Sequence, residues 1–173
     1  MESITHALAQ LSQQQTDWQQ ATLLQIEATE SYFYQAASKE VITLPIGYQL
    51  VADKFFQHTP PNPDDLEYGI NYIEDEIERA IPRIGHIELL LSQQDFLIHI
   101  AELAGVPTAD TMLLPREQME RLFGYYAEIS QGRPPLPSEP DVSKVFYAKL
   151  LILREYMHHL KVLSLTLVPT PAV

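Results

Sequence analysis

Residues 142–168, VSKVFYAKLLILREYMHHLKVLSLTLV, form the longest run of the sequence that is strongly apolar and free of proline and glycine. At about 100° per residue, side chains such as Phe146, Leu150 and Tyr156 fall on one broad arc of a helix. An arc this wide predicts a central helix that is packed on more than one side. Leucines then alternate with polar residues, so residues 163–168 are predicted to form a strand with one buried face.

The N-terminal part of the chain predicts one helix and then strands. Residues 4–15 show apolar side chains at helical spacing. Residues 22–44 alternate apolar, aromatic and polar side chains, with turn residues at 29–30 and 37–39. This pattern predicts an antiparallel meander of three strands.

The middle of the chain is mainly helical by the same criteria. Helices are predicted at 46–57, from Pro63 as far as Pro82, at 93–104 and at 115–130. Residues 84–91 fit either a strand or the continuation of a helix kinked at Pro82. The segment that follows residue 104 is interpreted as a loop.

Together these elements predict an α+β fold. The sheet is expected to be antiparallel, with about three to five strands from the meander and the C-terminal strand, packed by about five or six helices. The alternative is a mostly helical protein with a small hairpin. A length of 173 residues indicates a single globular domain, 1–173. Within it, RPPLPSEP at 133–140 is a proline-rich connector, and 169–173 is expected to be a flexible tail.

Composition excludes several classes of function. There is no cysteine, so disulfides, thiolate metal sites and cysteine nucleophiles are excluded, which fits a cytoplasmic protein. No apolar run reaches the roughly 18 residues of a membrane span. Acids outnumber bases by 23 to 11, and the resulting charge of −12 disfavours nucleic acid and anionic membranes as partners.

The candidate site is the polar face of the last helix, with Arg154, Glu155, His158 and His159. Glu155 lies three and four residues before the two histidines, so these side chains can meet. The Glu-x-x-His spacing occurs in dinuclear metal proteins, but those need it on two helices, and here it occurs once. We therefore predict local pairing, with no metal and no cofactor. The acidic residues 74–78 are interpreted as a solvated face.

Two hypotheses for function follow. The sequence has no glycine-rich nucleotide loop and no nucleophile elbow. The main hypothesis is therefore a non-catalytic intracellular interaction or accessory protein that forms a homodimer. The alternative is a small-molecule-binding protein or an enzyme, in which Arg154 receives an anionic ligand and His158 or His159 acts as acid or base. Whether the chain catalyses a reaction is left open.

Overall fold

The computed structural model describes residues 16–169, which fold around a single six-stranded mixed sheet. The strands are β1 (Ala21–Ile26), β2 (Ser31–Gln35), β3 (Glu40–Leu44), β4 (Leu89–Ser92), β5 (Met112–Pro115) and β6 (Ser164–Leu167). The helices are the 3₁₀ turn η1 (Thr16–Gln20), α2 (Tyr48–Phe55), α3 (Pro63–Ile84), α4 (Asp95–Leu103), α5 (Arg116–Ser130) and α6 (Lys144–His159).

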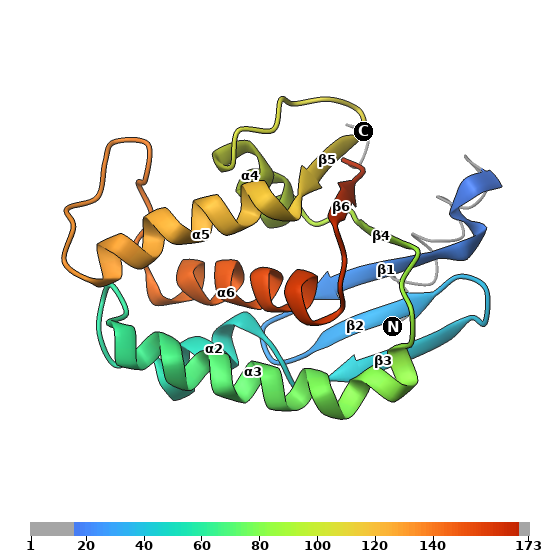
Figure 1. Ribbon diagram of the computed structural model, residues 1–173, viewed down its shortest axis with the longest axis horizontal. Coiled ribbons are helices and arrows are strands. Elements are labelled where there is room, and N and C mark those ends of the chain that lie inside the picture. Colours follow the sequence, from blue (N-terminus) through green and yellow to red (C-terminus); the bar gives the residue numbers. More distant parts are fainter. Residues whose placement is uncertain (1–15, 170–173) are drawn as a thin grey trace.

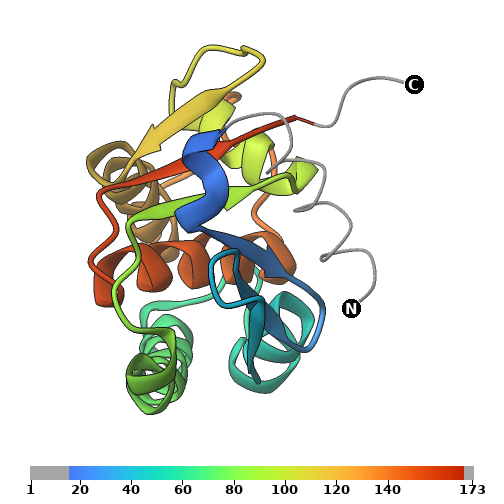
Figure 2. The same cartoon turned by 90° about the vertical axis from the view of Figure 1, so that its right-hand side faces the viewer.

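The sheet corrects the predicted fold class. Its order is β3-β2-β1-β4-β6-β5, which Figure 2 shows from blue β1 through green β4 and red β6 to yellow β5. Strands β1, β4 and β6 run parallel, whereas β2, β3 and β5 join them by antiparallel pairing with their neighbours. The expectation of an antiparallel sheet of three to five strands is therefore wrong, and so is the mostly helical alternative.

Two short strands explain this error. β4 and β5 are four residues long, too short for a period of two to be separated from a helical period. β5 also ends on Pro115 and lies in the segment that was interpreted as a loop. In β4, three of four residues are buried, as in a strand covered on both faces. Parallel pairing depends on partners distant in sequence, which a local pattern does not reveal.

Most of the longer elements are confirmed. The meander at 22–44 corresponds to β1, β2 and β3, and each predicted helix from 46 onward is present within two or three residues of its expected bounds. α3 passes through Pro82 and ends two residues later, where the Gly85 amide donates to the carbonyl of Ile81. A proline so close to the end removes only one hydrogen bond. The predicted helix at 4–15 and residues 170–173 of the predicted tail lie outside the described residues.

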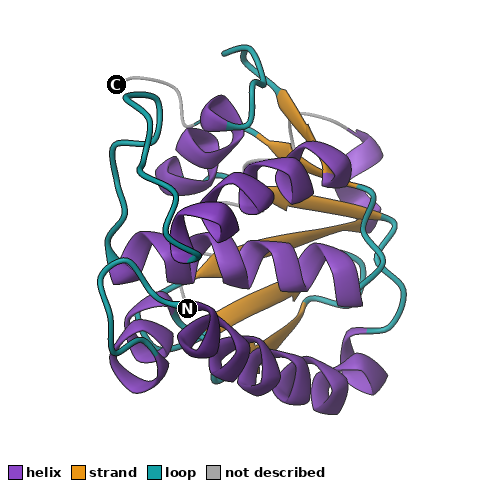
Figure 3. Ribbon diagram, turned by 60° about the vertical axis from the view of Figure 1, so that its left-hand side comes forward, coloured by secondary structure: helices purple, strands orange, loops and turns teal. Residues whose placement is uncertain are grey.

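The core has two parts, one on each face of the sheet. The larger part combines side chains from β1 to β6 with side chains from all the helices α2 to α6. α6 lies between α3 and α5 at its centre, and helices α2 to α6 cover one face of the sheet (Figures 1 and 3). Leu150, Ile152 and Leu153 of the predicted arc are completely buried, and so is Leu151 on the other side, which confirms that the helix is packed on more than one side. The smaller part, around Trp18, Leu23 and Leu91, lies on the opposite face.

Within residues 16–169, no helix has both the length and the apolar character that crossing a membrane requires.

Two buried tyrosines provide a test of the core. The Tyr147 hydroxyl donates to the Tyr126 carbonyl at 2.7 Å, whereas the buried Tyr126 hydroxyl has no hydrogen-bond partner among the described residues. Burial, with smaller contributions from Glu139 and Asp141, raises the pKa of Tyr126 to about 12, so the hydroxyl stays protonated. We expect Tyr147→Phe to lower the free energy of unfolding by about 1 kcal/mol. Tyr126→Phe should leave it unchanged or raise it. Denaturant unfolding of both variants measures the difference, and equal losses would contradict the assignment.

Candidate functional site

The polar face of α6 meets one acid from each neighbouring helix. Glu74 of α3 approaches it from one side and Glu120 of α5 from the other. Arg154, Glu155 and His159 lie between these two acids, at the C-terminal end of α6. We call this group, together with His158, the α6 cluster.

Arg154 is held by two carboxylates. Its Nε donates to Glu120 at 2.8 Å and its Nη1 to Glu155 at 2.6 Å. The guanidinium also lies 4.6 Å from the centroid of the Phe123 ring, a distance at which cation–π attraction contributes. Arg154 is therefore largely neutralised by its own protein, which limits what it can offer an anionic ligand.

His159 is approached by two carboxylates at the same ring atom. Its Nε2 lies 3.0 Å from Glu155 Oε2 and 3.1 Å from Glu74 Oε1. The predicted local pairing of Glu155 with a histidine is thus confirmed for His159. His158 is more than half exposed, and its Nδ1 is 4.0 Å from Glu120 Oε1, so its contact is on the α5 side.

Glu155 is the buried member of the cluster, with 1% of its surface exposed. Burial raises the pKa of this carboxyl, while the nearby Arg154 and His159 act in the opposite direction without cancelling the effect. Three carboxyl groups, those of Glu74, Glu120 and Glu155, surround a single guanidinium. This surplus of negative charge favours a cation over an anion at the cluster.

The sequence did not reveal Glu74 and Glu120 as members of the cluster. Glu74 belongs to the acidic run expected on a solvated face, yet it contacts His159. No sequence pattern indicates Glu120, because this residue contacts Arg154 only when α5 packs on α6.

The order of elements along the chain places the α6 cluster at the end of the sheet where the parallel strands begin. α6 ends at His159 and β6 begins at Ser164, so the cluster lies near the amino ends of the parallel strands β1, β4 and β6. Ligands of open α/β sheets bind at the other end of the strands, beyond their carboxyl ends. The carboxyl ends of β1 and β4 are therefore a second candidate location.

The carboxyl end of β1 is bridged by Gln94, which directly precedes α4. The Gln94 side chain accepts from the Ile26 amide at 2.7 Å and donates to the Ile26 carbonyl at 2.9 Å. Beside it, the first amides of α2 are also satisfied. Tyr48 N donates to the Glu27 carbonyl, and the next two amides donate to the Ala28 carbonyl.

A lysine lies between the helices that begin at this end of the sheet. Lys149 of α6 places its Nζ 4.7 Å from the ring centroid of Tyr48 in α2 and 4.7 Å from that of Phe96 in α4. None of the ion pairs within residues 16–169 involves Lys149. Tyr48 and Phe96 are the first and second residues of their helices. The ammonium is thus held near two helix N-termini, where positive partial charge also gathers.

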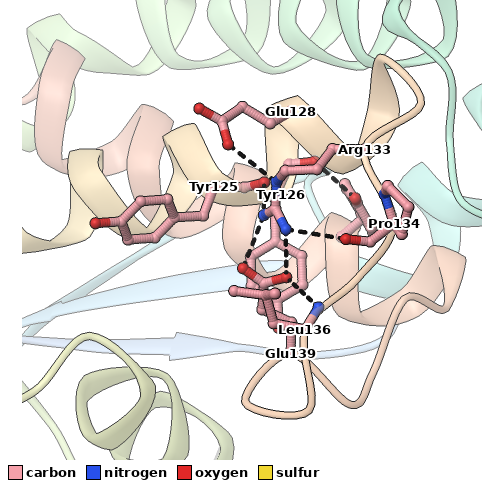
Figure 4. Close-up of polar contacts among 8 residues, drawn as sticks. Tyr125, Tyr126, Glu128, Arg133, Pro134, Leu136 and Glu139 are labelled. Carbon is pink, nitrogen blue, oxygen red and sulfur yellow. Dashed lines mark hydrogen bonds and ion pairs between the residues drawn. The ribbon is translucent and has the colours of Figure 1, made fainter.

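A third feature is the segment 133–140, which joins α5 to α6. Arg133 holds this segment against α5 through hydrogen bonds and ion pairs, as Figure 4 shows. Its Nε donates to Glu128, its Nη1 to Glu139 and the Pro134 carbonyl, and its Nη2 to Glu139 and the Tyr125 carbonyl. Every N–H of the guanidinium is therefore used inside the protein.

A cavity of about 350 Å³ opens beside this segment. Leu103, Leu122, Tyr125 and Leu136 supply its apolar wall, and Arg133 lies among its polar residues. Since Arg133 has no free donor, the cavity offers little to an anionic group. Its charged lining residues are Glu128, Glu139 and Arg133, which leaves it with net negative charge.

Solved phosphatase structures share this fold. The crystal structure of a type II variant of the Aquifex aeolicus Ppx/GppA phosphatase aligns with a TM-score of 0.66 and 16% identity, over 86% of this chain and 53% of that one. An exopolyphosphatase from Cytophaga hutchinsonii aligns with a TM-score of 0.65 and 16% identity, over 86% of this chain and 53% of the other. The chain therefore spans about half the length of these structures.

These likenesses define a Ppx/GppA-like α/β fold, and at such low identity they show the fold alone. Neither the comparison with family models nor that with curated proteins finds a match to this chain.

The comparison corrects the main functional hypothesis. A non-catalytic interaction or accessory protein was expected because no catalytic motif was found in the sequence. The solved structures that share the fold are instead named as phosphatases and exopolyphosphatases, which are enzymes. They agree better with the alternative, a small-molecule-binding protein or enzyme for an anionic ligand.

Proposed function

We propose that this chain is a small-molecule-binding or catalytic domain for an anionic, phosphate-bearing ligand. The likeness of its fold to phosphatases supports the chemical class of the ligand. The observation that carries the placement is Lys149, an ammonium without an ion-pair partner among the described residues, near the first residues of α2 and α4 at the carboxyl ends of the strands, where α/β sheets bind ligands.

The surroundings of Lys149 suit a phosphate group. The side chain is half-buried and its Nζ lies 4.7 Å from the centroids of two aromatic rings, so less conformational entropy is left to lose on binding. A lysine binds phosphate as a point charge. Because the whole chain carries a charge of −12, an anion needs such a local positive group.

The hydrogen bonds at this end of the sheet also limit the mode of binding. The α2 amides are already bonded to the β1–β2 turn, and the side chain of Gln94 fills the end of β1. The ligand is therefore expected to contact Lys149 and the first turn of α4, without a glycine-rich loop around its phosphate.

A lysine substitution tests this placement. We expect the protein to bind tripolyphosphate in isothermal titration calorimetry, and Lys149→Met to weaken binding at least about tenfold, the loss of one charge-assisted contact. Lys54→Met is the matched control, because Lys54 also lies over two rings, Phe55 and Tyr72, but at the far end of α2. Equal affinities of the Lys149 variant and the wild type would rule the placement out.

Catalysis is measured separately, as phosphate released from tripolyphosphate. The acid or base role of His158 or His159, with Arg154 and Glu155, stays a prediction. If His158→Asn released phosphate at the wild-type rate, His158 would have no such role.

The homodimer and the cytoplasmic location also stay predictions. Light scattering tests whether the protein forms a homodimer.

A further inference from the structure

We propose that Glu74, Glu155 and His159 form a binding site for one divalent transition-metal ion, of the Zn²⁺ or Mn²⁺ class. The site lies between α3 and the end of α6 (Figure 1). It is near the amino ends of the parallel strands, so it is separate from the ligand placement at Lys149. Each proposal can fail without the other.

The ligand atoms are already assembled. One atom from each residue, the ring nitrogen of His159 and a carboxylate oxygen of Glu74 and of Glu155, lies within 4.8 Å of both others. The nitrogen is 3.0 and 3.1 Å from the two oxygens. Two ligand atoms bound to one ion at about 2.1 Å lie about 3.4 Å apart at a tetrahedral angle and about 3 Å apart at a right angle. Small side-chain movements are enough to admit an ion.

Hydrogen bonds to His159 alone cannot satisfy both carboxylates fully. Both carboxylates point at Nε2 of His159, which carries at most one proton. That proton is shared between them or serves only one. A metal ion in its place binds the nitrogen lone pair and one oxygen from each carboxylate. It also neutralises the negative charge that Glu74 and Glu155 bring together.

Glu155 is positioned for this role by a second contact. One of its oxygens accepts from Arg154, and the other faces His159. Arg154 is in turn fixed by Glu120. Such outer contacts hold a ligating carboxylate in one orientation. Since Glu155 is buried, the arrangement is that of a pre-formed site and not of a mobile surface pair.

The donor set selects the kind of metal. An imidazole nitrogen with carboxylate oxygens suits Zn²⁺ and Mn²⁺, whereas Ca²⁺ and Mg²⁺ prefer all-oxygen sites. Three protein ligands leave coordination positions for water. His159 and Glu74 are both partly exposed, so an ion can reach the site from solvent.

The test is metal binding by the full chain after treatment with a chelator. Calorimetry with Zn²⁺ is expected to show one site, and Zn²⁺ should raise the melting temperature. His159→Gln and Glu74→Gln should each weaken binding at least about 100-fold, because each removes a direct ligand. His158→Gln and Glu78→Gln are matched controls on the same helices, and both should bind as the wild type does.

Three outcomes overturn the proposal. These are no saturable binding of Zn²⁺ or Mn²⁺ by the wild type, normal binding by both ligand variants, and a loss of binding for His158→Gln as large as that for His159→Gln. The last result would indicate non-specific binding by surface imidazoles. If His159→Gln fails to fold by circular dichroism, the Glu74→Gln variant decides the matter, since the Glu74 side chain is 38% exposed.

Discussion

Replacing Gly47 with alanine is expected to lower the free energy of unfolding by about 3 kcal/mol or more, the upper range for a forced steric overlap. A Cβ at this position would lie 2.4 Å from the Ala28 carbonyl group and 2.4 Å from the Thr29 carbonyl carbon. These are backbone atoms of the turn between β1 and β2, which cannot rotate away as a side chain can. The turn would have to move.

The cost is steric and not conformational. The backbone of Gly47 is extended, with φ −137° and ψ 152°, which any residue adopts. Movement of the turn would also break the bonds that the amides of Gln49 and Leu50 donate to Ala28. Local strain would therefore spread to the start of α2.

Gly124→Ala is the matched control. Gly124 lies in α5, and an added Cβ would meet nothing within 4 Å. Here alanine should raise stability by about 0.5–1 kcal/mol through helix propensity. Urea unfolding of both variants measures the contrast, and a Gly47 variant as stable as the wild type would show that the turn is not packed as described.

Asp65→Ala is expected to cost about 2–3 kcal/mol of unfolding free energy, the penalty for removing a charged acceptor from several donors. One buried oxygen, Oδ2, accepts from the amides of Gln57 and His58 at 3.1 and 2.9 Å and lies 3.0 Å from Nδ1 of His58. It also accepts a hydrogen bond from the Asn62 amide. In return, the Asn62 side chain accepts a hydrogen bond from the Asp65 amide, so α3 begins with a capping box.

The same contacts predict a pH dependence. Burial by itself would raise the pKa of Asp65, but the hydrogen bonds from His58, Gln57 and Asn62 outweigh it and hold the pKa below its ordinary value of 3.8. A lowered pKa means that the ionised carboxylate stabilises the folded state. This contribution is complete above the unfolded value, near pH 4, and is lost as the pH falls through the folded value.

The Asp65→Asn variant removes the negative charge of the side chain and keeps its shape, so it isolates the contribution of the charge to stability. The difference in stability between wild type and this variant should be largest near neutral pH and shrink below pH 4. Asp64→Asn, at the exposed neighbouring position, should change stability by about 0.5 kcal/mol. If the Asp65→Asn difference were the same at pH 3 and pH 7, the proposed role of the ionised carboxylate would be wrong.

The elements that the sequence predicted are those with a long or regular pattern. α6 and α3 repeat their apolar residues over several turns, and the meander alternates over more than twenty residues, so periodicity identifies them. β4 and β5 have four residues each and carry too little periodicity. The sequence predicts no strand at β5 and leaves β4 open between a strand and a helix, which hides the parallel pairing and with it the α/β class.

The candidate sites show the same limit. The contact between Glu155 and His159 spans one helical turn, and the sequence predicted it from spacing alone. Glu74 and Glu120 join the cluster through packing of α3 and α5 on α6, which no local pattern encodes. Lys149 stands out only in the folded chain, because its partners Tyr48 and Phe96 come from two other helices.

The position of β6 has a consequence for how the protein is made. β6 pairs with β4 on one side and β5 on the other, yet it is synthesised after both. During translation, β1 to β3 can pair as soon as they leave the ribosome, whereas β4 and β5 expose unpaired edges until β6 arrives. The nascent chain thus passes through a stage that is open to intermolecular strand pairing, which rapid insertion of β6 brings to an end.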